Sequence, residues 1–477
     1  MTRSFRTGGI IHHLPLFTVL GAVIGFPGLA WAETAVPSFS TGPSCTSPFK
    51  KKAVPEKTLR SIVRSHAQWL EERHDPDHHR AELCQADLRN AVLNGANLER
   101  ANFEGATLRQ ARLHQTSLTQ ARLAGADLTK AGMEDGNISG ADLRHAKLSH
   151  ANLFRVSGGE VALYDAVLIG ARLHESTFER AHFEGADLTS ADFTDASLID
   201  SYFYGANLQR TILSGADFLE SDLRRTNLSK ATMRRTNLQG ALLDGATLNG
   251  ARLVEADLEG AYFDEADLTN ANLREAQLRG ADLRFTNLES TGFQQADLEG
   301  VNFEGARLVR TQFRSANLRM AILYHAVLNG TDFREAKLPS AVLIGARGTG
   351  VNFTKADLGD IYAPKASLQR AQFIEANLES ANLVSADLRG SNFSRAKLEH
   401  ANLQEAHLQD ASFPGANLTG VRLDGAELRH ANLRGVNLAG AVGLTQSQID
   451  SACLDEQTTL PAGLNRPAPC PATRNKR

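Results

Sequence analysis

Few side chains in this sequence could carry out chemistry, and the most suggestive group lies ahead of the long repeat described below. The run His74-Asp75-Pro76-Asp77-His78-His79 places imidazoles beside carboxylates, which are ligands of transition metals. Its spacing matches no closed metal site and Pro76 marks a turn, so we predict no bound metal there. The sequence contains no G-x-S-x-G, no H-E-x-x-H and no phosphate-binding glycine loop. We therefore expect no catalytic residues and no cofactor.

The rest of the chain is organised by a repeat of five residues. Residues 81–440 keep one frame from Leu83 to Leu438, which gives 72 pentad centres. Of these centres 51 are Leu and 15 are Phe, and only Gly158, Gly348 and Ala363 are not large and apolar. The residue two positions before the centre is Ala in 52 pentads. A period of five fits neither a helix nor a flat strand, whereas a solenoid with one pentad per side would turn every centre inward.

Phenylalanine indicates how many sides each coil has. Seven rings recur at every twentieth position, namely Phe293, Phe313, Phe333, Phe353, Phe373, Phe393 and Phe413. This interval equals four pentads, so we predict a four-sided coil with these rings stacked in one column. The 72 pentads then make 18 coils. At about 4.8 Å per coil, the rod is on the order of 85 Å long. We interpret the three weak centres as tolerated defects or bends rather than as a bulge that shapes a binding surface.

The Ala-(Asp/Asn)-Leu-x-x pattern resembles the pentapeptide-repeat family over residues 81–440, about three quarters of the chain. The resemblance implies an all-β solenoid, a right-handed quadrilateral β-helix with helices ahead of the first coil and a tail folded over the last one. It implies no catalytic residues. The best-known members of the family mimic DNA and bind type II topoisomerases.

The segment before the repeat predicts export. Residues 1–32 begin with Arg3 and Arg6, continue with an apolar run over 14–31, and end in Ala30-Trp31-Ala32, a cleavage site of the A-x-A type. The alternative is an uncleaved membrane anchor. A cleaved signal peptide predicts a bacterial protein that is periplasmic or extracellular.

Two further segments connect and close the repeat. Residues 33–56 are rich in Pro, Ser and Thr and are expected to be a linker. Residues 57–80 are expected to form an N-terminal capping helix and turn, because apolar residues and His66 share one helix face. We interpret His66 as a packing residue rather than a ligand. Residues 441–477 are expected to be a C-terminal cap and tail, with a capping box at Thr445 and Gln448 and a helix near 446–453.

The four cysteines support the export prediction. Cys45 and Cys84 lie before or within the first coil, and Cys453 and Cys470 lie after the last one. We predict the pairs Cys45–Cys84 and Cys453–Cys470, because the other two pairings would have to span the rod. An oxidising compartment permits both disulfides, and free thiols are the alternative.

One side of the predicted rod carries all six tyrosines: Tyr164, Tyr202, Tyr204, Tyr262, Tyr324 and Tyr362. We call it the tyrosine side and define it by the centres Leu83, Phe103 and every twentieth residue to Leu423. Phe285 lies on the same side, and His145, His150 and His182 are expected to face outward without partners. We interpret the tyrosines as a candidate interaction patch, since exposed tyrosines are common in binding surfaces. The alternative is that they line an ordinary solvated surface.

Charge also differs between the four predicted sides. The tyrosine side carries −6 and its neighbour with centres Leu98 to Leu438 carries −8. The side with centres Leu88 to Leu428 carries +4, and the phenylalanine-column side carries +2. We therefore expect a rod that is acidic along two adjacent sides and mildly basic along the other two.

These observations favour a non-enzymatic exported scaffold that binds an unknown protein or envelope component, with no small-molecule substrate. The alternative is a DNA-mimicking topoisomerase binder. Basic residues such as Arg224, Arg225, Arg234 and Arg235 interrupt the acidic pattern that a mimic needs, and export would separate the protein from cytoplasmic DNA enzymes. An enzyme is disfavoured because a rod filled by Leu has no cleft.

Overall fold

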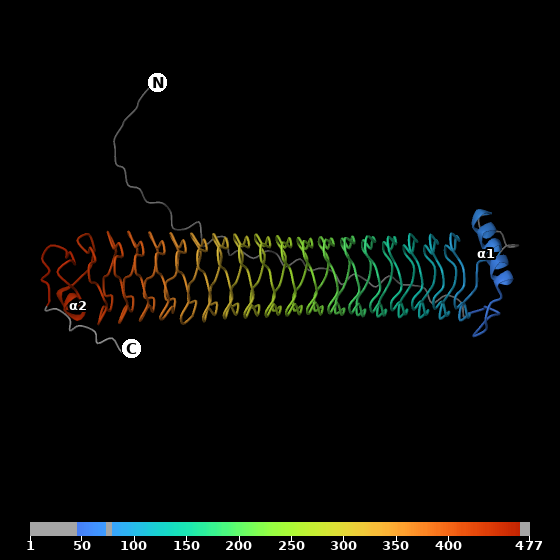
Figure 1. Ribbon diagram of the computed structural model, residues 1–477, viewed down its shortest axis with the longest axis horizontal. Helices are drawn as coiled ribbons and strands as arrows, with labels where there is room; N and C mark the ends of the chain where they lie inside the picture. The colour runs from blue at the N-terminus through green and yellow to red at the C-terminus, as the bar shows by residue number, and fades with distance from the viewer. Residues whose placement is uncertain (1–44, 73–78, 468–477) are drawn as a thin grey trace, which may run out of the picture. The chain divides into compact units, whose positions relative to one another are not determined.

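The repeat region of the computed structural model is a stack of similar coils, with one helix near each end (Figure 1). The structure describes residues 45–72 and 79–467. The expected signal peptide, the residues His74 to His78 and Cys470 lie outside the described residues. The helices are α1, Glu56–Glu71, and α2, Gln446–Ser451.

Each coil contains four short extended segments that pair with the coils before and after it. The β-bridges of the repeat are isolated and parallel, and each joins a residue to the one four pentads later, from Glu82–Asn102 to Arg422–Val442. Leu88 N–H donates to the Thr107 carbonyl, and Thr107 N–H donates to the Ala86 carbonyl, at 2.8 and 2.9 Å. This spacing confirms the prediction of four pentads per coil.

The corners explain the last residue of the pentad. The N–H of Ala91 donates to the Leu88 carbonyl at 3.0 Å, which closes a turn. Asn90 in that turn has φ 59°, and Gly95 in the next has φ 67°. Left-handed backbone is the conformation that glycine adopts without strain and that asparagine tolerates. The frequent glycine at this position therefore follows from the turn.

The Asp or Asn before each centre also has a local role. The N–H of Thr269 donates to Asp267 Oδ1 at 3.0 Å, and the N–H of Gln239 donates to Asn237 Oδ1 at 3.1 Å. Short polar side chains that accept from the backbone two residues on stabilise such turns. The Ala-(Asp/Asn)-Leu pattern thus encodes a small inward residue, a turn-stabilising side chain and a large inward residue.

The core is a continuous column inside the coils. The large centres are buried throughout, and the phenylalanines of the seven-ring column stack in parallel, for example Phe333 on Phe353 at 5.0 Å and 4°. Where Thr or Ser replaces the small inward Ala, its hydroxyl donates to a backbone carbonyl, as Thr211 does to Leu208 at 2.7 Å. Burial of a hydroxyl without such a bond would be costly.

The weak centres leave the ladder intact. The N–H of Gly158 donates to the Thr177 carbonyl at 2.7 Å, and the N–H of Gly348 donates to the Ser367 carbonyl at 2.7 Å. Ala363 is completely buried. These positions are therefore accommodated inside regular coils, which agrees with tolerated defects and not with bulges.

The helix α1 lies against the first coil. It begins at Glu56, one residue before the expected start of the capping segment at Lys57, and ends at Glu71. Leu59 is buried, and Ile62 and Val63 pack against the core. His66 is fully buried, and its Nδ1 accepts the N–H of Ala81 at 3.1 Å. His66 is a packing residue that joins α1 to the repeat, as predicted.

The expectation of a linker over residues 33–56 is wrong for its last part. The segment from Cys45 to Pro55 pairs with the first coil, where the N–H groups of Lys51 and Val54 donate to Gln85 and Asp87 carbonyls at 2.6 and 3.2 Å. A disulfide joins Cys45 to Cys84. The open edge of the first coil offers unpaired N–H and C=O groups, which gives this segment a backbone partner that composition does not reveal.

The chain after the repeat continues onto the last coil. The capping box of α2 is present, with reciprocal bonds between Thr445 and Gln448. The Gln448 amide also donates to the Leu423 and Ala426 carbonyls, each at 2.9 Å. Beyond α2, Cys453 and Thr459 pair with Asn432 and Asn437. No helix in the described part of the chain has both the length and the apolar character that a bilayer span requires.

Candidate interaction surface

Three rings on the tyrosine side form a ladder on successive coils. The ring of His182 stacks between those of Tyr164 and Tyr202, with centroids 5.0 and 4.7 Å apart. The Nδ1 of His182 also lies 3.1 Å from Glu184 Oε1. The expectation that His182 is unpartnered is therefore wrong. His182 lies four pentads, or one coil, before Tyr202, so the repeat itself could have predicted that the two rings are neighbours.

Burial and the nearby Glu184 carboxylate raise the pKa of the Tyr164 hydroxyl. The Tyr164 ring thus stays neutral at any physiological pH. The histidine at position 145 also has a neighbour, because its Nδ1 lies 3.7 Å from Asp165 Oδ2. The expectation of an outward histidine without a partner is wrong for this residue as well.

Tyr204 stands beside the ladder and is more exposed. Its side chain is 42% exposed, and the guanidinium carbons of Arg224 and Arg225 lie 6.0 and 5.8 Å from its ring centroid. Arginine over an aromatic face is a favourable contact. The patch around Tyr202 and Tyr204 therefore places one exposed ring, that of Tyr204, beside two guanidinium groups.

The remaining tyrosines are not part of this cluster. Tyr262 follows Tyr202 by three bridges, through Asp222 and Leu242, and is 39% exposed. Tyr324 lies farther along and packs on His325 at 4.0 Å, and Tyr362 is 38% exposed. The structure thus brings Tyr164, Tyr202 and Tyr204 together and leaves Tyr262, Tyr324 and Tyr362 at intervals along the same side.

A set of charged residues lies between Tyr204 and Tyr324. Arg224 and Arg284 form ion pairs with Asp222 and Asp282 at 2.6 and 2.7 Å. The Oδ1 of Asp244 accepts the N–H of Asp264 at 3.0 Å.

Burial raises the pKa of both carboxyls in the middle of this set, Asp244 and Asp264. Both carboxyls therefore hold a proton more readily than an ordinary Asp side chain.

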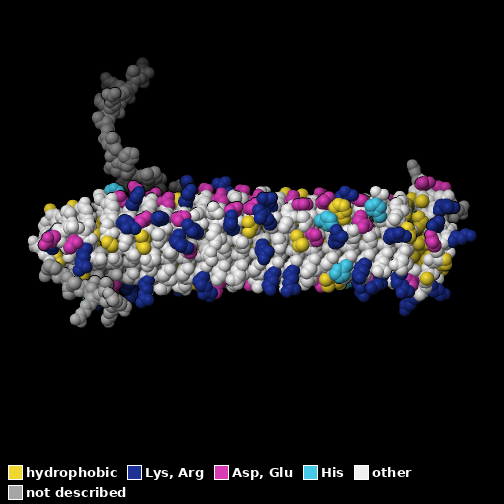
Figure 2. Space-filling view, viewed as in Figure 1, with side chains coloured by type: hydrophobic (Ala, Val, Ile, Leu, Met, Phe, Trp, Pro, Cys, Tyr) yellow, Lys and Arg dark blue, Asp and Glu magenta, His cyan; other side chains and the backbone are white. Residues whose placement is uncertain are grey.

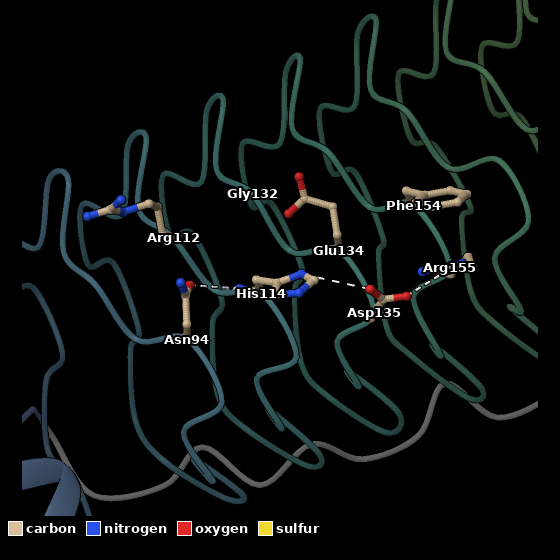
Figure 3. Close-up of a pocket in the computed structure, with 8 residues that line it drawn as sticks. All are labelled: Asn94, Arg112, His114, Gly132, Glu134, Asp135, Phe154 and Arg155. Carbon is tan, nitrogen blue, oxygen red and sulfur yellow. Dashed lines mark hydrogen bonds and ion pairs between the residues drawn. The ribbon is translucent and has the colours of Figure 1, made fainter.

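A shallow depression lies on the phenylalanine-column side, which is opposite the tyrosine side. Gly132 occupies an outward position where other pentads carry a side chain, and the depression around it has a volume of about 480 Å³ (Figure 3). A second depression of about 590 Å³ surrounds Gly292, the other glycine at an outward position before a centre. Sequence reasoning missed both, although the two glycines in that position were visible.

Two carboxylates of the first depression have partners nearby. The Asp135 carboxylate binds Arg155 at 2.7 Å and lies 3.8 Å from His114 Nδ1 (Figure 3). The Glu134 carboxylate accepts from the amide of Asn152 at 2.6 Å. Within residues 45–72 and 79–467, no three His, Cys, Asp or Glu side chains are placed to hold a metal ion.

The distribution of charge is uneven on the visible face of the rod. Acidic side chains are concentrated along the upper edge in Figure 2, whereas the lower edge carries mostly Lys and Arg. Hydrophobic side chains are scattered along the coils and gather near α1. The predicted difference in charge between sides is consistent with this view.

The fold is a solenoid built from a repeat of five residues (Figure 1). Two family models describe this repeat. "Pentapeptide repeats (8 copies)" matches several windows within residues 79–144 and 233–360. "Pentapeptide repeat region" matches residues 171–248 and 366–442. Together they cover more than half of the chain, and the protein belongs to the pentapeptide-repeat family. Proteins of this family are structural and interaction proteins, and neither model indicates an enzyme.

Solved structures of the same kind are similar to parts of the chain. HetL, a pentapeptide repeat protein involved in heterocyst differentiation regulation in the cyanobacterium Nostoc, is 32% identical over 49% of this chain and 88% of its own, with a TM-score of 0.23. A pentapeptide repeat protein of the Arabidopsis thaliana thylakoid lumen is 34% identical over 21% and 70%, with a TM-score of 0.13.

QnrB1, a plasmid-mediated fluoroquinolone resistance protein, is 18% identical over 38% of this chain and 92% of its own, with a TM-score of 0.17. No curated protein sequence matches this chain. Because the TM-scores are low, the family assignment depends on the repeat models and not on these superpositions.

Proposed function

We propose that this protein is a non-enzymatic, exported rod that binds a macromolecular partner through its tyrosine side. The proposal includes a cleaved signal peptide at residues 1–32 and a right-handed rod of 18 coils. It also includes closure of the rod by α1 at one end and by the segment around α2 at the other. The observation that carries it is the gathering of Tyr164, His182, Tyr202 and Tyr204 on one flat side, beside paired charges.

The composition of this patch supports a binding role. Interface centres are rich in Tyr and Arg, because both bury large area and retain a polar group. The three tyrosines Tyr204, Tyr262 and Tyr362 are each exposed to nearly the same degree on one side of the rod. The Cys45–Cys84 disulfide supports export, since such bonds persist in oxidising compartments.

The DNA-mimic alternative is less well supported. A mimic needs rows of carboxylates that stand in for phosphates, but here arginines are bound to the carboxylates of the acidic sides. Arg224 and Arg284 neutralise Asp222 and Asp282 on the tyrosine side. A supercoiling assay that shows inhibition of a type II topoisomerase by the purified chain would favour this alternative.

A photocrosslinking amino acid tests the proposed surface in intact cells. We expect crosslinked products when the probe replaces Tyr204. The matched control replaces Asn249, which is exposed on the adjacent side of the rod one pentad after Asp244. Equal products from both positions, or none from Tyr204, would rule out the tyrosine side as the binding surface.

A further inference from the structure

We propose that the partner of the tyrosine side is a second copy of this chain, packed antiparallel about a two-fold axis at Tyr262. This inference rests on the proposed function, because it takes the tyrosine side as a binding surface and names its occupant. It is argued from the order of charges and rings along that side.

The outward residues of the tyrosine side form two columns that run along the rod. The residues before the centres are bridged from coil to coil, as in Tyr202–Asp222 and Leu242–Tyr262. The residues after the centres form the second column. In chain order this column contains Tyr204, Arg224, Asp244, Asp264, Arg284, Glu304 and Tyr324, with Asp264 in the middle. A two-fold axis that lies in the plane of the interface, perpendicular to the long axis of the rod, turns the tyrosine sides toward each other, makes the two rods antiparallel and places each column opposite its own copy.

With the axis at the coil of Tyr262, side chains of opposite charge face each other across the interface. Asp244 lies opposite Arg284 of the second copy, and Arg224 lies opposite its Glu304. The rings match in the same register, because Tyr204 faces Tyr324 of the second copy and Tyr202 faces its Ile322. Each of these contacts occurs twice, as an isologous interface requires.

Neighbouring registers lack this match. An axis half a coil toward Asp244 places Arg224 against Arg284 and Asp222 against Asp282, which are like charges. An axis half a coil the other way pairs Asp264 with Arg284 but places Asp244 against Glu304. An axis at the coil of Asp244 pairs Arg224 with Asp264 but places Glu184 against Glu304 and Asp244 against its own copy. Charge complementarity therefore selects the register at Tyr262.

The Asp244 carboxylate is the central group that gains a cation from a second copy. Asp244 has the backbone N–H of Asp264 as its hydrogen-bond donor, and Oδ1 of Asp264 is buried without a hydrogen-bond partner among the described residues. In the antiparallel pair the guanidinium of Arg284 from the second copy reaches Asp244. Asp264 and Glu265 meet their own copies at the axis, and this repulsion is the cost of the arrangement.

In this register the repeat regions of the two copies also overlap along their whole length. The axis lies near the middle of the repeat, so the coil of Phe103 faces the coil of Leu423 in the second copy. Sixteen steps of about 4.8 Å and a strand segment about 10 Å wide give an upper limit of roughly 800 Å² per partner. That is the size of a standard specific interface. Phe285, which is 56% exposed, faces Gly245 of the second copy in this register.

Single-cysteine crosslinking tests the axis directly in the full mature chain. With a short bifunctional maleimide, Tyr262→Cys alone should give a covalent dimer, because the residue lies on the two-fold axis. Tyr204→Cys and Tyr324→Cys should each give none alone and should give a dimer when mixed. Asn302→Cys, which faces Asp222, is the matched control in the Tyr262 column. A dimer from Asn302→Cys, or none from Tyr262→Cys, overturns the proposed register.

Charge variants provide a second measurement by sedimentation equilibrium. Arg284→Glu should weaken self-association at least about tenfold, and adding Asp244→Lys should restore it. Asp264→Asn should strengthen it, because repulsion at the axis is removed. Circular dichroism of each variant checks that the rod is folded. A wild-type chain that stays monomeric at high micromolar concentration overturns the inference.

The outcome also separates this inference from the proposed function. If the probe at Tyr204 captures other molecules in cells and no second copy, the tyrosine side is a binding surface and the homodimer is wrong. If the probe captures nothing while Asn249 does, both are wrong. If it captures the chain itself, both are supported.

Discussion

The ring of Phe178 occupies the space that a side chain at Gly158 would need. A Cβ built on Gly158 would lie 2.4 Å from Cε1 of Phe178, which is one coil further along the same column. The two residues therefore share one volume, with glycine in one coil and the larger ring in the next. The large side chain that is missing at Gly158 is thus replaced in the core by the larger ring of Phe178, one coil later.

This shared volume predicts non-additive effects on stability. Gly158→Ala should destabilise the rod by about 1–3 kcal/mol, because the new methyl group overlaps the Phe178 ring. In the double variant with Phe178→Leu, most of that loss should be recovered. Urea unfolding of the two single variants and the double variant measures the coupling. Strictly additive losses would mean that the two side chains do not compete for space.

The contact between His66 and Ala81 predicts pH-dependent docking of α1. Burial lowers the pKa of His66 below its ordinary value of 6.5, and neutral Nδ1 is the atom that accepts the Ala81 N–H. His66 therefore binds a proton more readily when α1 is unfolded than when α1 is docked on the first coil. The stabilisation is complete above pH 6.5 and is lost as the pH falls through the lowered pKa.

Hydrogen exchange at the Ala81 amide measures this effect. Protection should fall on acidification in the wild-type chain. In the control His66→Phe, protection should be lower at neutral pH and nearly independent of pH in the same range. Wild-type protection that is constant from pH 7 to about pH 4 would contradict the prediction.

The Cys45–Cys84 disulfide predicts a redox-sensitive end. It joins residues 39 apart in sequence, and closing such a loop stabilises by about 4 kcal/mol in the chain-entropy model. Because a solenoid unfolds locally, the loss in Cys45→Ser with Cys84→Ser should be confined to residues 45–72 and the first coils. Exchange at the amides of Lys51 and Val54 measures it, with amides of the Phe353 coil as internal control. Equal loss of protection at both places would argue for one cooperative unit.

The depression at Gly132 predicts a stabilising substitution. Gly132 is not in the left-handed region, and a Cβ there would meet the flexible carboxylate of Glu134 at 3.0 Å. Gly132→Asn should supply a side-chain oxygen that accepts the backbone N–H two residues on, as Asn272 accepts that of Arg274. The substitution should raise the free energy of unfolding by up to about 1 kcal/mol. Thermal unfolding checks it, and Gly292→Asn is the matched test on the same side. A lower melting temperature for both would show that the outward glycines are required.

Within the repeat, contacts follow from the order of residues. Each residue of a coil pairs with the one four pentads away, so the column of Phe293 to Phe413 and the grouping of tyrosines could be predicted from spacing alone. The stacking of His182 on Tyr202 obeys the same rule, because the two residues are twenty positions apart.

At the ends and on the surface, spacing ceases to be informative. Residues 45–55 carry no repeat, and their pairing with the first coil depends on an open edge that exists once the coils have formed. The exposure of Tyr204, the depression at Gly132 and the carboxyl of Asp264 without a donor depend on side-chain positions in three dimensions. Periodicity is a local property that repeats the same contacts, whereas edges and surfaces are decided by which distant groups happen to meet.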